Sequence, residues 1–406
     1  MSLEIAMTGL RAANKELTVT SNNIANTATV GFKKAEVNFG DVYLDGGSGK
    51  QLPMGVKIVS ATQNFSQGDL RTTDKQMDLA IIGEGFFRLS SNGTTTYSRA
   101  GSFGVDRDGF IVNKSGHRLT GFVPDESGVV ISQLQELQID AAYAPPKQTG
   151  SMEMNMNLHT SPEPLANPTF DKADPGSYSY SNATTIFDSL GESHLATMYF
   201  RKSAPNTWVV HTFVGDQEVR PPAGDVMEFS EDGSLLSVNG DVSALVTTND
   251  FTPKAGAAEM NFNISFRDVT QYDGKTGINA LTQDGYPAGR LTGLQIDEEG
   301  FIFGRYTNDQ LKVHGQIVLT NFRNPAGLAN ADDTSWWKTL ASGEAVNERP
   351  GSGTMGLIQS GALEGSNVDI TEELVSIIGS QRNYQANAQV ISATDTMTQT
   401  IMNIRR

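Results

Sequence analysis

Residues 351–356 read Gly-Ser-Gly-Thr-Met-Gly and match the spacing of the dinucleotide-binding fingerprint G-x-G-x-x-G. That fingerprint brings backbone against a pyrophosphate, and it needs a buried strand before it and a helix that opens within it. Here Asn-Glu-Arg-Pro comes before the glycines and Leu-Ile-Gln follows them. These flanking residues favour a flexible loop over a nucleotide site.

The other residue types that could do chemistry are scattered. No two histidines have the His-x-x-x-His spacing of a helical metal site, so each is expected to be a strand or surface residue; they are His117, His159, His194, His211 and His314. The absence of cysteine excludes disulfides, thiolate metal sites and a cysteine nucleophile. No G-x-S-x-G nucleophile elbow is present. The sequence therefore predicts neither an enzyme nor a cofactor.

Two acidic pairs and one aromatic pair have a simpler structural explanation. Asp106 with Asp108, and Glu298 with Glu299, offer oxygens for calcium, but both pairs precede a glycine between strand-like segments. A hairpin turn accounts for that pattern more simply than a metal site does. Trp336-Trp337 lies in a strand-like segment, where neighbouring side chains alternate in direction. One tryptophan is expected in a core and the other on the surface as a contact.

Composition narrows the possible partners. The chain has 406 residues, 38% of them hydrophobic, and no apolar run approaches the ~18 residues of a membrane span. We expect no secretory signal, because Glu4, Arg11 and Lys15 interrupt the N-terminal segment. The net charge is −16, while residues 1–24 are neutral and residues 366–406 carry −1. An acidic middle disfavours nucleic acid and anionic membranes.

Both ends of the chain have a hydrophobic period near 3.5 residues. At the N-terminus the large apolar residues recur every seven positions, at Leu3, Leu10, Leu17 and Ile24. At the C-terminus the steps alternate between four and three within successive groups, which are Ile370, Leu374 and Ile377, then Tyr384, Ala388 and Ile391, then Thr398 and Met402. This period predicts helices over 1–26 and 366–406 that pack along narrow seams. Asp369 followed by Glu372 is the pattern of a capping box at the start of the second helix.

Two interpretations of these helices remain open. They could form an ordinary intramolecular hairpin within a globular core. Their seams, however, contain small and polar residues such as Ala6, Thr20 and Gln381, which weaken a lone pair of helices. The C-terminal helix is also rich in Asn and Gln, which suits contacts on several sides. We therefore favour assembly, with the helices packing on each other and on neighbouring copies.

The rest of the chain reads as mainly β structure. Residues 27–70 are expected to be an extended linker segment with a Gly-rich turn at 46–49. Residues 103–112 and 294–303 share the order strand, acidic turn, Gly, aromatic, Ile, which indicates one discontinuous inner β domain, 71–145 and 284–362. Residues 146–283 are then an inserted outer β domain. The predicted fold is multidomain and mainly β, with sandwich- or barrel-like domains stacked outward from a coiled-coil-like pair of terminal helices.

Several segments resemble the bacterial flagellar axial family, whose members form the rod, the hook and the hook junctions. The resemblance is marked in 21–33 and 381–387, and also includes 361–369, 78–87 and 97–103. The signature residues are Asn22, Asn23, Ile24, Ala25, Asn26, Gly31, Phe32, Gln381, Arg382, Asn383 and Tyr384. Within the family, the length and the inserted middle favour the hook branch.

This resemblance implies a structural subunit that self-polymerises into a curved, flexible tube outside the cell, a universal joint between the rod and the filament. The implied partners are other copies of the chain, the distal rod, the hook cap, the hook-filament junction proteins and the flagellar export apparatus, which exports subunits without a cleaved signal. No nucleic acid, membrane insertion or cofactor is implied. A distal rod or hook-junction protein remains the alternative within the family. An extracellular adhesin or enzyme-like β-protein with helical ends is the alternative outside it.

Overall fold

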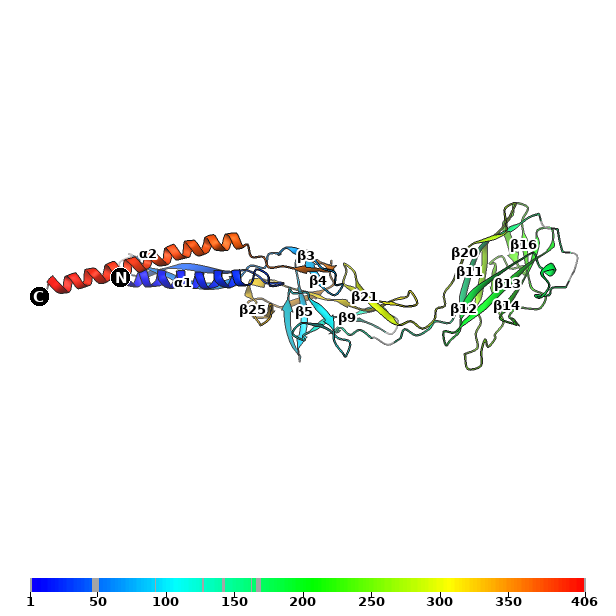
Figure 1. The fold of residues 1–406 in the computed structure, drawn as a ribbon, viewed down its shortest axis with the longest axis horizontal. Helices are drawn as coiled ribbons and strands as arrows, with labels where there is room; N and C mark the ends of the chain where they lie inside the picture. Colours follow the sequence, from blue (N-terminus) through cyan, green and yellow to red (C-terminus); the bar gives the residue numbers. More distant parts are fainter. Residues whose placement is uncertain are drawn as a thin grey trace. The chain divides into compact units, whose positions relative to one another are not determined.

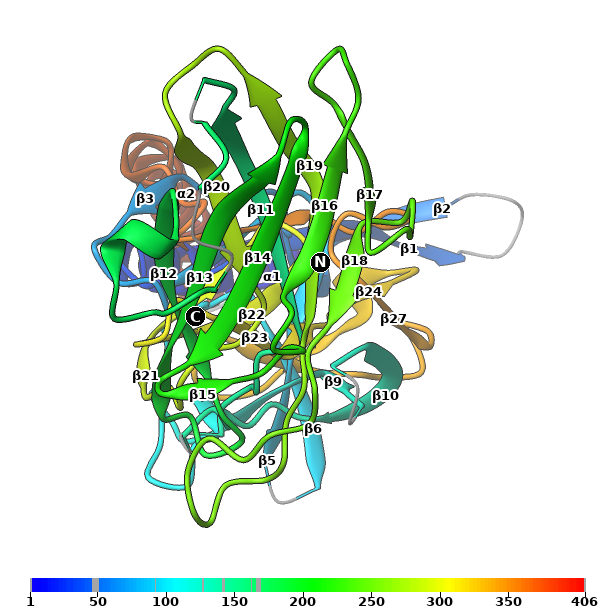
Figure 2. The ribbon, with the colours of Figure 1, turned by 90° about the vertical axis from the view of Figure 1, so that its right-hand side faces the viewer.

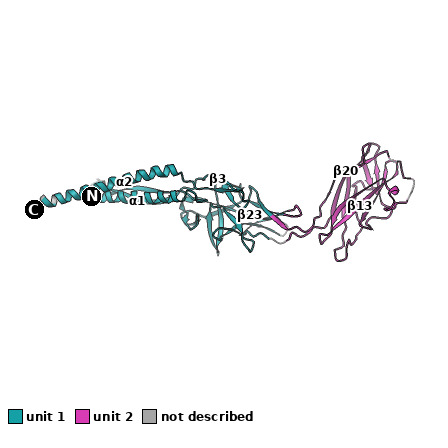
Figure 3. Cartoon of the chain, in the orientation of Figure 1, with its two compact units in different colours: residues 1–141, 293–305, 311–406 teal, residues 142–292, 306–310 magenta. Residues whose placement is uncertain are grey.

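The chain folds into two compact units, as Figure 3 shows by colour. Unit 1 comprises residues 1–141, 293–305 and 311–406, and unit 2 comprises 142–292 and 306–310. The structure, a computed structural model, describes residues 2–45, 51–91, 93–125, 128–140, 143–161, 163–165 and 169–404. The Gly-rich turn predicted at 46–49 lies outside the described residues.

Unit 1 begins and ends with a long helix, α1 (Ser2–Ala25) and α2 (Ile370–Ile404), which lie side by side (Figure 1). The segment predicted as an extended linker carries β1 (Ala35–Asp45) and β2 (Gln51–Gln63), which pair antiparallel. Two short antiparallel pairs follow, joining β28 (Leu357–Ser360) to β4 (Leu79–Ile82) and β29 (Ala362–Glu364) to β3 (Leu70–Thr72). These pairs bring the segment before α2 back to strands from the first part of the chain.

The remaining strands of unit 1 form a 13-stranded sheet. Its strands from the first half of the chain are β5 (Phe86–Ser91), β6 (Thr94–Ser98), β7 (Phe103–Val105), β8 (Ile111–Asn113), β9 (Arg118–Pro124) and β10 (Val130–Glu136). Those from the second half are β21 (Leu291–Ile296), β22 (Phe301–Tyr306), β23 (Leu311–Ile317), β24 (Leu319–Phe322), β25 (Ala329–Asn330), β26 (Ser335–Trp337) and β27 (Ala345–Glu348), with a 3₁₀ turn η2 (Pro325–Gly327) before β25. Strands β5 and β9 pair with β24 and β23, so both halves share one sheet.

Unit 2 is a sandwich of two sheets. The four-stranded sheet has the order β18 (Leu245–Thr247), β19 (Asn263–Tyr272), β11 (Ser151–His159), β20 (Gly277–Gln283), with β11 and β19 parallel. The six-stranded sheet has β12 (Tyr180–Phe187), β13 (Ser193–Ala204), β14 (Thr207–Val214), β16 (Asp225–Phe229) and β17 (Leu235–Val238) in order, with β15 (Gln217–Glu218) beside β14 and a 3₁₀ turn η1 (Pro175–Ser177) before β12 (Figure 2).

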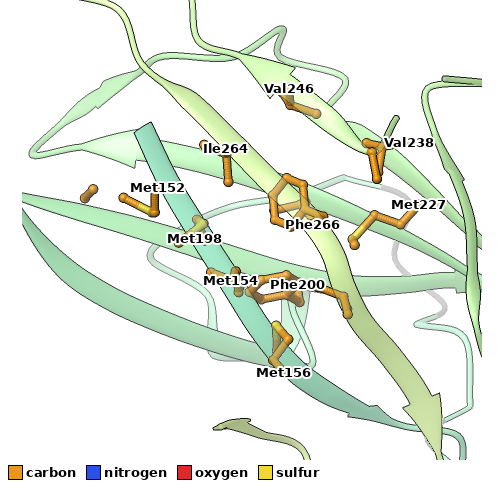
Figure 4. Packing of buried hydrophobic residues seen from close by; sticks show 14 of the residues in the cluster. Met152, Met154, Met156, Met198, Phe200, Met227, Val238, Val246, Ile264 and Phe266 are labelled. Atoms are coloured by element: carbon orange, nitrogen blue, oxygen red, sulfur yellow. The ribbon is translucent and has the colours of Figure 1, made fainter. Parts of the chain in front are cut away.

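The core of unit 2 lies between these sheets. Met152, Met154 and Met156 occupy alternate positions of β11 and are at most 2% exposed, as the period of two requires for a strand with one inward face. They pack with residues such as Phe200 and Phe266 in one large apolar cluster (Figure 4). The predicted class, mainly β with a terminal helix pair, is confirmed.

One turn recurs in both units. In each example a side-chain oxygen of the first residue accepts the backbone N–H four positions later, and a glycine with φ of about +80° stands three positions along. Among the described residues these turns include Asp106–Phe110, Asn113–His117, Asp125–Val129, Asp188–Glu192, Ser230–Ser234 and Asp297–Phe301. The glycine is needed because this backbone conformation is costly for residues with a Cβ atom. The acidic pairs at 106–108 and 297–299 thus belong to hairpin turns, as predicted.

The glycines of 351–356 serve close packing. The segment follows β27 and precedes β28, so the buried strand and helix of a dinucleotide site are not at this place. Gly356 N donates to Glu84 O at 2.8 Å, and a Cβ on Gly356 would lie 2.3 Å from the carbonyl oxygen of Ile82. The loop predicted to be flexible is therefore a hydrogen-bonded turn that packs on residues 82–84.

Candidate functional site: the terminal helices and their junction

Small residues line the face of α1 that is buried within unit 1. Ala6, Ala13 and Thr20 recur every seven residues and are 3–4% exposed. Gly9 lies where a Cβ would meet the Asn387 side chain of α2 at 2.7 Å. A seam of small residues lets two helix backbones approach closely, and it leaves the larger apolar residues to either side. Leu10, Leu17 and Ile24 are accordingly only half-buried, and Leu3 is exposed.

Helix α1 also contacts the β1–β2 hairpin. Thr8 Oγ1 accepts the Val56 N–H at 3.3 Å, and Gly55 has φ +103° with its α-carbon against Thr8. A Cβ at Gly55 would lie 2.2 Å from the Thr8 hydroxyl, so glycine is required there for the hairpin to approach the helix. The first helix therefore has α2 on one side and the hairpin on another (Figure 1).

Helix α2 presents a mixed face to α1. Of its predicted seam residues, Ile377, Ala388 and Ile391 are half-buried. Exposed in the single chain are Ile370, Leu374, Tyr384 and Met402. Of the signature residues on α2, Gln381, Arg382, Asn383 and Tyr384 are all exposed. The assignment of these residues to seams between copies stays a prediction.

The start of α2 is capped as predicted, in part. Asp369 Oδ1 accepts the N–H groups of Thr371 at 2.7 Å and Glu372 at 3.2 Å, and these bonds hold the pKa of Asp369 below its usual value. The second half of the capping box is different. The Glu372 carboxylate accepts from Lys34 Nζ at 3.1 Å, because the chain after α1 brings that cation to the helix start.

At the end of α1, the signature asparagines hold the chain as it leaves the helix. Asn23 is 1% exposed. Its side chain pairs with both backbone groups of Ala35, accepting from N at 3.0 Å and donating to O at 2.9 Å, and it also donates to Glu373 of α2 at 3.2 Å. Asn26 Nδ2 bonds Asn22 O, and Thr29 donates to Asn26 Oδ1. Ile24 and Ala25 lie between these asparagines, half-buried and exposed respectively.

Gly31 allows a close approach of two backbone segments at this junction. It has φ +70°, and a Cβ there would lie 2.5 Å from the backbone nitrogen of Ala100. Its N–H donates to the carbonyl of Glu364 at 2.8 Å. This close approach to residues 99–100 is the packing reason for a glycine at this signature position. Phe32, the next signature residue, is half-buried.

A buried ion cluster adjoins the segment 31–33, where the chain leaves α1. Glu364 and Lys33 are both 0% exposed and pair at 2.6 Å, and Arg99 reaches the other carboxylate oxygen at 3.2 Å. Lys33 also donates to Ser66 O at 2.7 Å, and Gly68 N donates to Glu364 at 3.0 Å. Burial lowers the pKa of Lys33 and of Arg99, and the negative charge of Glu364 opposes this in both.

Sequence reasoning did not assign a role to this cluster. The available signal was the charge of Lys33, Arg99 and Glu364, each of which stands within a family-like segment of mostly small and apolar residues. Its three members come from the chain after α1, the end of β6 and the last strand before α2. The cluster therefore fixes both terminal segments to the sheet of unit 1.

Three cavities surround the same junction. The first, of about 260 Å³, lies between α1, α2 and β1 and is lined by polar groups including Asn23, Lys34 and Glu373. The other two, of about 350 and 300 Å³, share Thr29, Asp333 and Thr334. Among the described residues, no three His, Asp or Glu side chains come together as metal ligands would. No described helix is long and apolar enough to cross a membrane.

Four family models match separate parts of the chain, in order from the N-terminus to the C-terminus. Residues 3–33 match the flagella basal body rod protein model, and 80–147 match the flagellar hook protein FlgE/F/G D1 domain. Residues 154–286 match the flagellar basal body protein FlaE D2 domain, and 359–404 match the flagellar basal body rod FlgEFG protein C-terminal model.

Curated relatives match over their full length. The flagellar hook protein FlgE of Salmonella typhimurium is 39% identical over 414 residues, with 100% of both chains covered. That of Escherichia coli K12 is 38% identical with the same coverage, and that of Borreliella burgdorferi is 30% identical, covering 100% of this chain and 99% of its own. The crystal structure of Helicobacter pylori flagellar hook protein FlgE2 shares the fold, with a TM-score of 0.52 and 15% identity, over 72% of this chain and 100% of that one. With its resemblance to the axial family borne out in this way, the chain belongs to the flagellar hook protein family.

Proposed function

We propose that this chain is the structural subunit of a bacterial flagellar hook and polymerises through its terminal helices into a curved, flexible tube. The family membership supports a hook subunit over the rod and junction alternatives, since the relatives matched over full length are named hook proteins. The function is mechanical and not catalytic. In this proposal the tube lies outside the cell, where it joins the rod to the filament.

The observation that carries this proposal is the exposed apolar surface of the two helices. On α1 the exposed apolar residues are Leu3, Ile5 and Met7, at 38–41%. On α2 they are Ile370, Leu374, Val375, Ile378, Tyr384, Val390, Met397 and Met402, at 38–68%. A helix pair that leaves this much apolar surface in water is stabilised when neighbouring copies cover it. We infer that the nearly neutral helices line the channel of the tube and that the acidic middle of the chain faces solvent.

Its partners follow from that location. Other copies of the chain are the main partner, and the distal rod, the hook cap, the hook-filament junction proteins and the export apparatus are the others we propose. Unit 2 is the outer part in this arrangement. An antibody against residues 151–283 should therefore label the hook along its whole length in cells. Labelling of the rod alone or of the hook tip alone would assign the chain to another member of the axial family.

The direct test compares two leucine substitutions. Leu374 on α2 and Leu311 on β23 are 49% and 55% exposed, so Leu374→Asp and Leu311→Asp should both leave the single chain folded. We expect tubes, seen by electron microscopy, from the wild type and from Leu311→Asp. Leu374→Asp should stay monomeric, because the polymer would bury an unpaired carboxylate. Tubes of normal length from Leu374→Asp would contradict the role of this helix face.

A further inference from the structure

A fully exposed leucine stands on a fixed loop of unit 1. Leu340, in the loop 338–343 after β26, is 102% exposed, and Trp337 at the end of that strand is 52% exposed. Single exposed apolar residues are normal on protein surfaces, so exposure alone carries little weight. What distinguishes this loop is how firmly its backbone is held.

Hydrogen bonds fix the loop on both sides of Leu340. Thr339 Oγ1 donates to Gly327 O at 2.5 Å, and Ser342, which is 0% exposed, donates to Thr339 O at 2.9 Å. Asn324 donates from its side chain to Ala341 O at 3.0 Å, and its own N–H bonds Ser342 O. The backbone that carries the leucine is therefore held in one conformation, and a contact made through this loop loses little backbone entropy.

A preformed pocket lies at the other end of the same hairpin. The cavity of about 300 Å³ is lined by Ala28, Val30 and Ala100, with Thr29 and Thr334 beside them. The turn that walls it, between β25 and β26, contains two residues with positive φ, Asp333 at +60° and Thr334 at +49°. Such a conformation is an outlier for a β-branched residue such as threonine, and it persists only where surrounding contacts impose it.

Those contacts are present. The Thr334 carbonyl accepts from Ser98 Oγ at 2.8 Å, and the Asp333 carboxylate accepts from Ser115 Oγ. Ala331 N donates to Ser335 O at 2.8 Å and closes the turn. The fold thus maintains a strained backbone in the turn that lines the pocket.

We propose that Leu340 of one copy, with Trp337 beside it, inserts into the pocket lined by Val30 and Thr334 of the next copy. This contact rests on the proposed polymerisation. Leu340 and the pocket are different surfaces of the chain, and in the proposed tube each copy gives its leucine to one neighbour and its pocket to another, so the contact is heterologous. A repeated heterologous contact that does not close into a ring generates an open helical polymer.

Two features favour a second copy as the occupant. The pocket wall at 28–30 continues directly from α1, whose exposed face is the proposed assembly surface. The charged residues around Leu340 and around the pocket are also complementary. Lys338 and Glu344 form an exposed ion pair beside Leu340, while Asp333 and Lys114 line the pocket, so each side offers one charge of each sign.

The test uses the absence of cysteine in the native chain. The variant Leu340→Cys/Val30→Cys is polymerised under reducing conditions and then oxidised, and the products are separated without reductant. We expect a ladder of disulfide-linked multimers from tubes and no crosslink in dilute monomer. Each single variant alone should give no ladder, and an equimolar mixture of the two should give dimers only. The control pair Leu340→Cys/Val129→Cys, whose second site is also exposed, should give no ladder.

A second measurement decides the proposal independently. Leu340→Asp should raise the critical concentration for polymerisation about tenfold or more, because one buried leucine side chain is lost from each contact. Val129→Asp should leave it unchanged. Tubes without a ladder, or normal polymerisation of Leu340→Asp, would overturn this contact and leave the proposed hook function intact. Failure of the wild-type chain to form tubes would overturn the proposed function itself.

Discussion

The Glu364 carboxylate connects the segment before α2 to the segment after α1. One of its oxygens accepts from Lys33 and from the Gly68 N–H, and the other accepts from Arg99. Because all three charged side chains are buried, their desolvation is offset only while the cluster is complete. The cluster therefore contributes little net stability as a whole, yet the loss of one member leaves the others uncompensated.

We predict that Glu364→Gln destabilises unit 1 by roughly 3–5 kcal/mol, since two buried cations then lack their counter-charge. Denaturant unfolding followed by tryptophan fluorescence would measure this, because Trp336 lies in the aromatic core of unit 1. The matched control is Glu344→Gln, which removes an acid whose side chain is 89% exposed in its pair with Lys338. The control should unfold like the wild type, and an equally small effect of Glu364→Gln would show that the cluster does not hold the junction.

Single residues differ in how far the sequence reveals them. Strand alternation predicted that one of Trp336 and Trp337 would be buried, and their exposures of 2% and 52% confirm it. Alternation could not say which one. The partners of Lys33 were out of reach, because Glu364 is 331 positions away and only the folded sheet brings the two together. Local patterns carry no information about a pair so distant.

At the scale of elements, the start of α2 depends on the charge of Asp369. Its carboxylate accepts two N–H groups of the first turn, which hold its pKa below the ordinary 3.8. An acid whose pKa is lower in the folded state contributes stability at a pH above its unfolded value. That contribution is lost as the pH falls through the folded pKa.

We therefore predict that the first turn of α2 loosens as the pH falls below about 3.8, the ordinary pKa of the acid. The amide signals of Thr371 and Glu372, followed by NMR, should move with the titration of this carboxyl. Asp369→Asn keeps a good capping side chain without a titrating group, so its signals at these positions should not show that transition. Asp369→Ala should show a loosened first turn at every pH. Identical titrations in the wild type and in Asp369→Asn would rule out this cap as the cause.

The helices show what periodicity can and cannot establish. A seven-residue repeat correctly predicted α1 and α2. It did not establish which member of the repeat faces the partner within the chain. In α1 that member is the small series of Ala6, Ala13 and Thr20, and the leucines lie beside it. Small residues are buried there because backbones approach closely, a property of the packed pair that hydrophobicity alone does not report. Similarly, the sequence predicted an extended linker segment over 27–70, while the β1–β2 pairing along α1 depends on tertiary contacts.

At the scale of the whole molecule, unit 2 is an insertion with paired connections. The backbone leaves and returns through antiparallel bridges between Ala144 and Gly289 and between Lys147 and Tyr286. Unit 2 has its own apolar core, and the sheet of unit 1 is built from strands on both sides of the insertion. Each unit therefore has the contacts it needs to fold by itself.

We predict that replacing residues 148–285 by a short Gly-Ser turn leaves unit 1 folded and able to polymerise, with the curvature of the tubes changed. Calorimetry should show one cooperative transition in this variant and a second one only in the full chain. A fragment spanning 143–291 should show that second transition alone. Loss of all structure in the shortened chain would mean that the two units are not independent.

The distance in sequence between Lys33 and Glu364 also affects the order in which parts of the chain can fold. When a chain emerges from its N-terminus onward, every strand of the unit 2 sandwich, from 151 to 283, is available before Glu364 arrives. The ion cluster at the end of α1 forms only afterwards, because Glu364 follows Lys33 by 331 residues. The segment that follows the first helix is therefore fixed to the sheet last. A chain cut short before Glu364 can complete the unit 2 sandwich and can pack α1 on the β1–β2 hairpin, but Lys33 and Arg99 then lack their carboxylate and the junction stays incomplete.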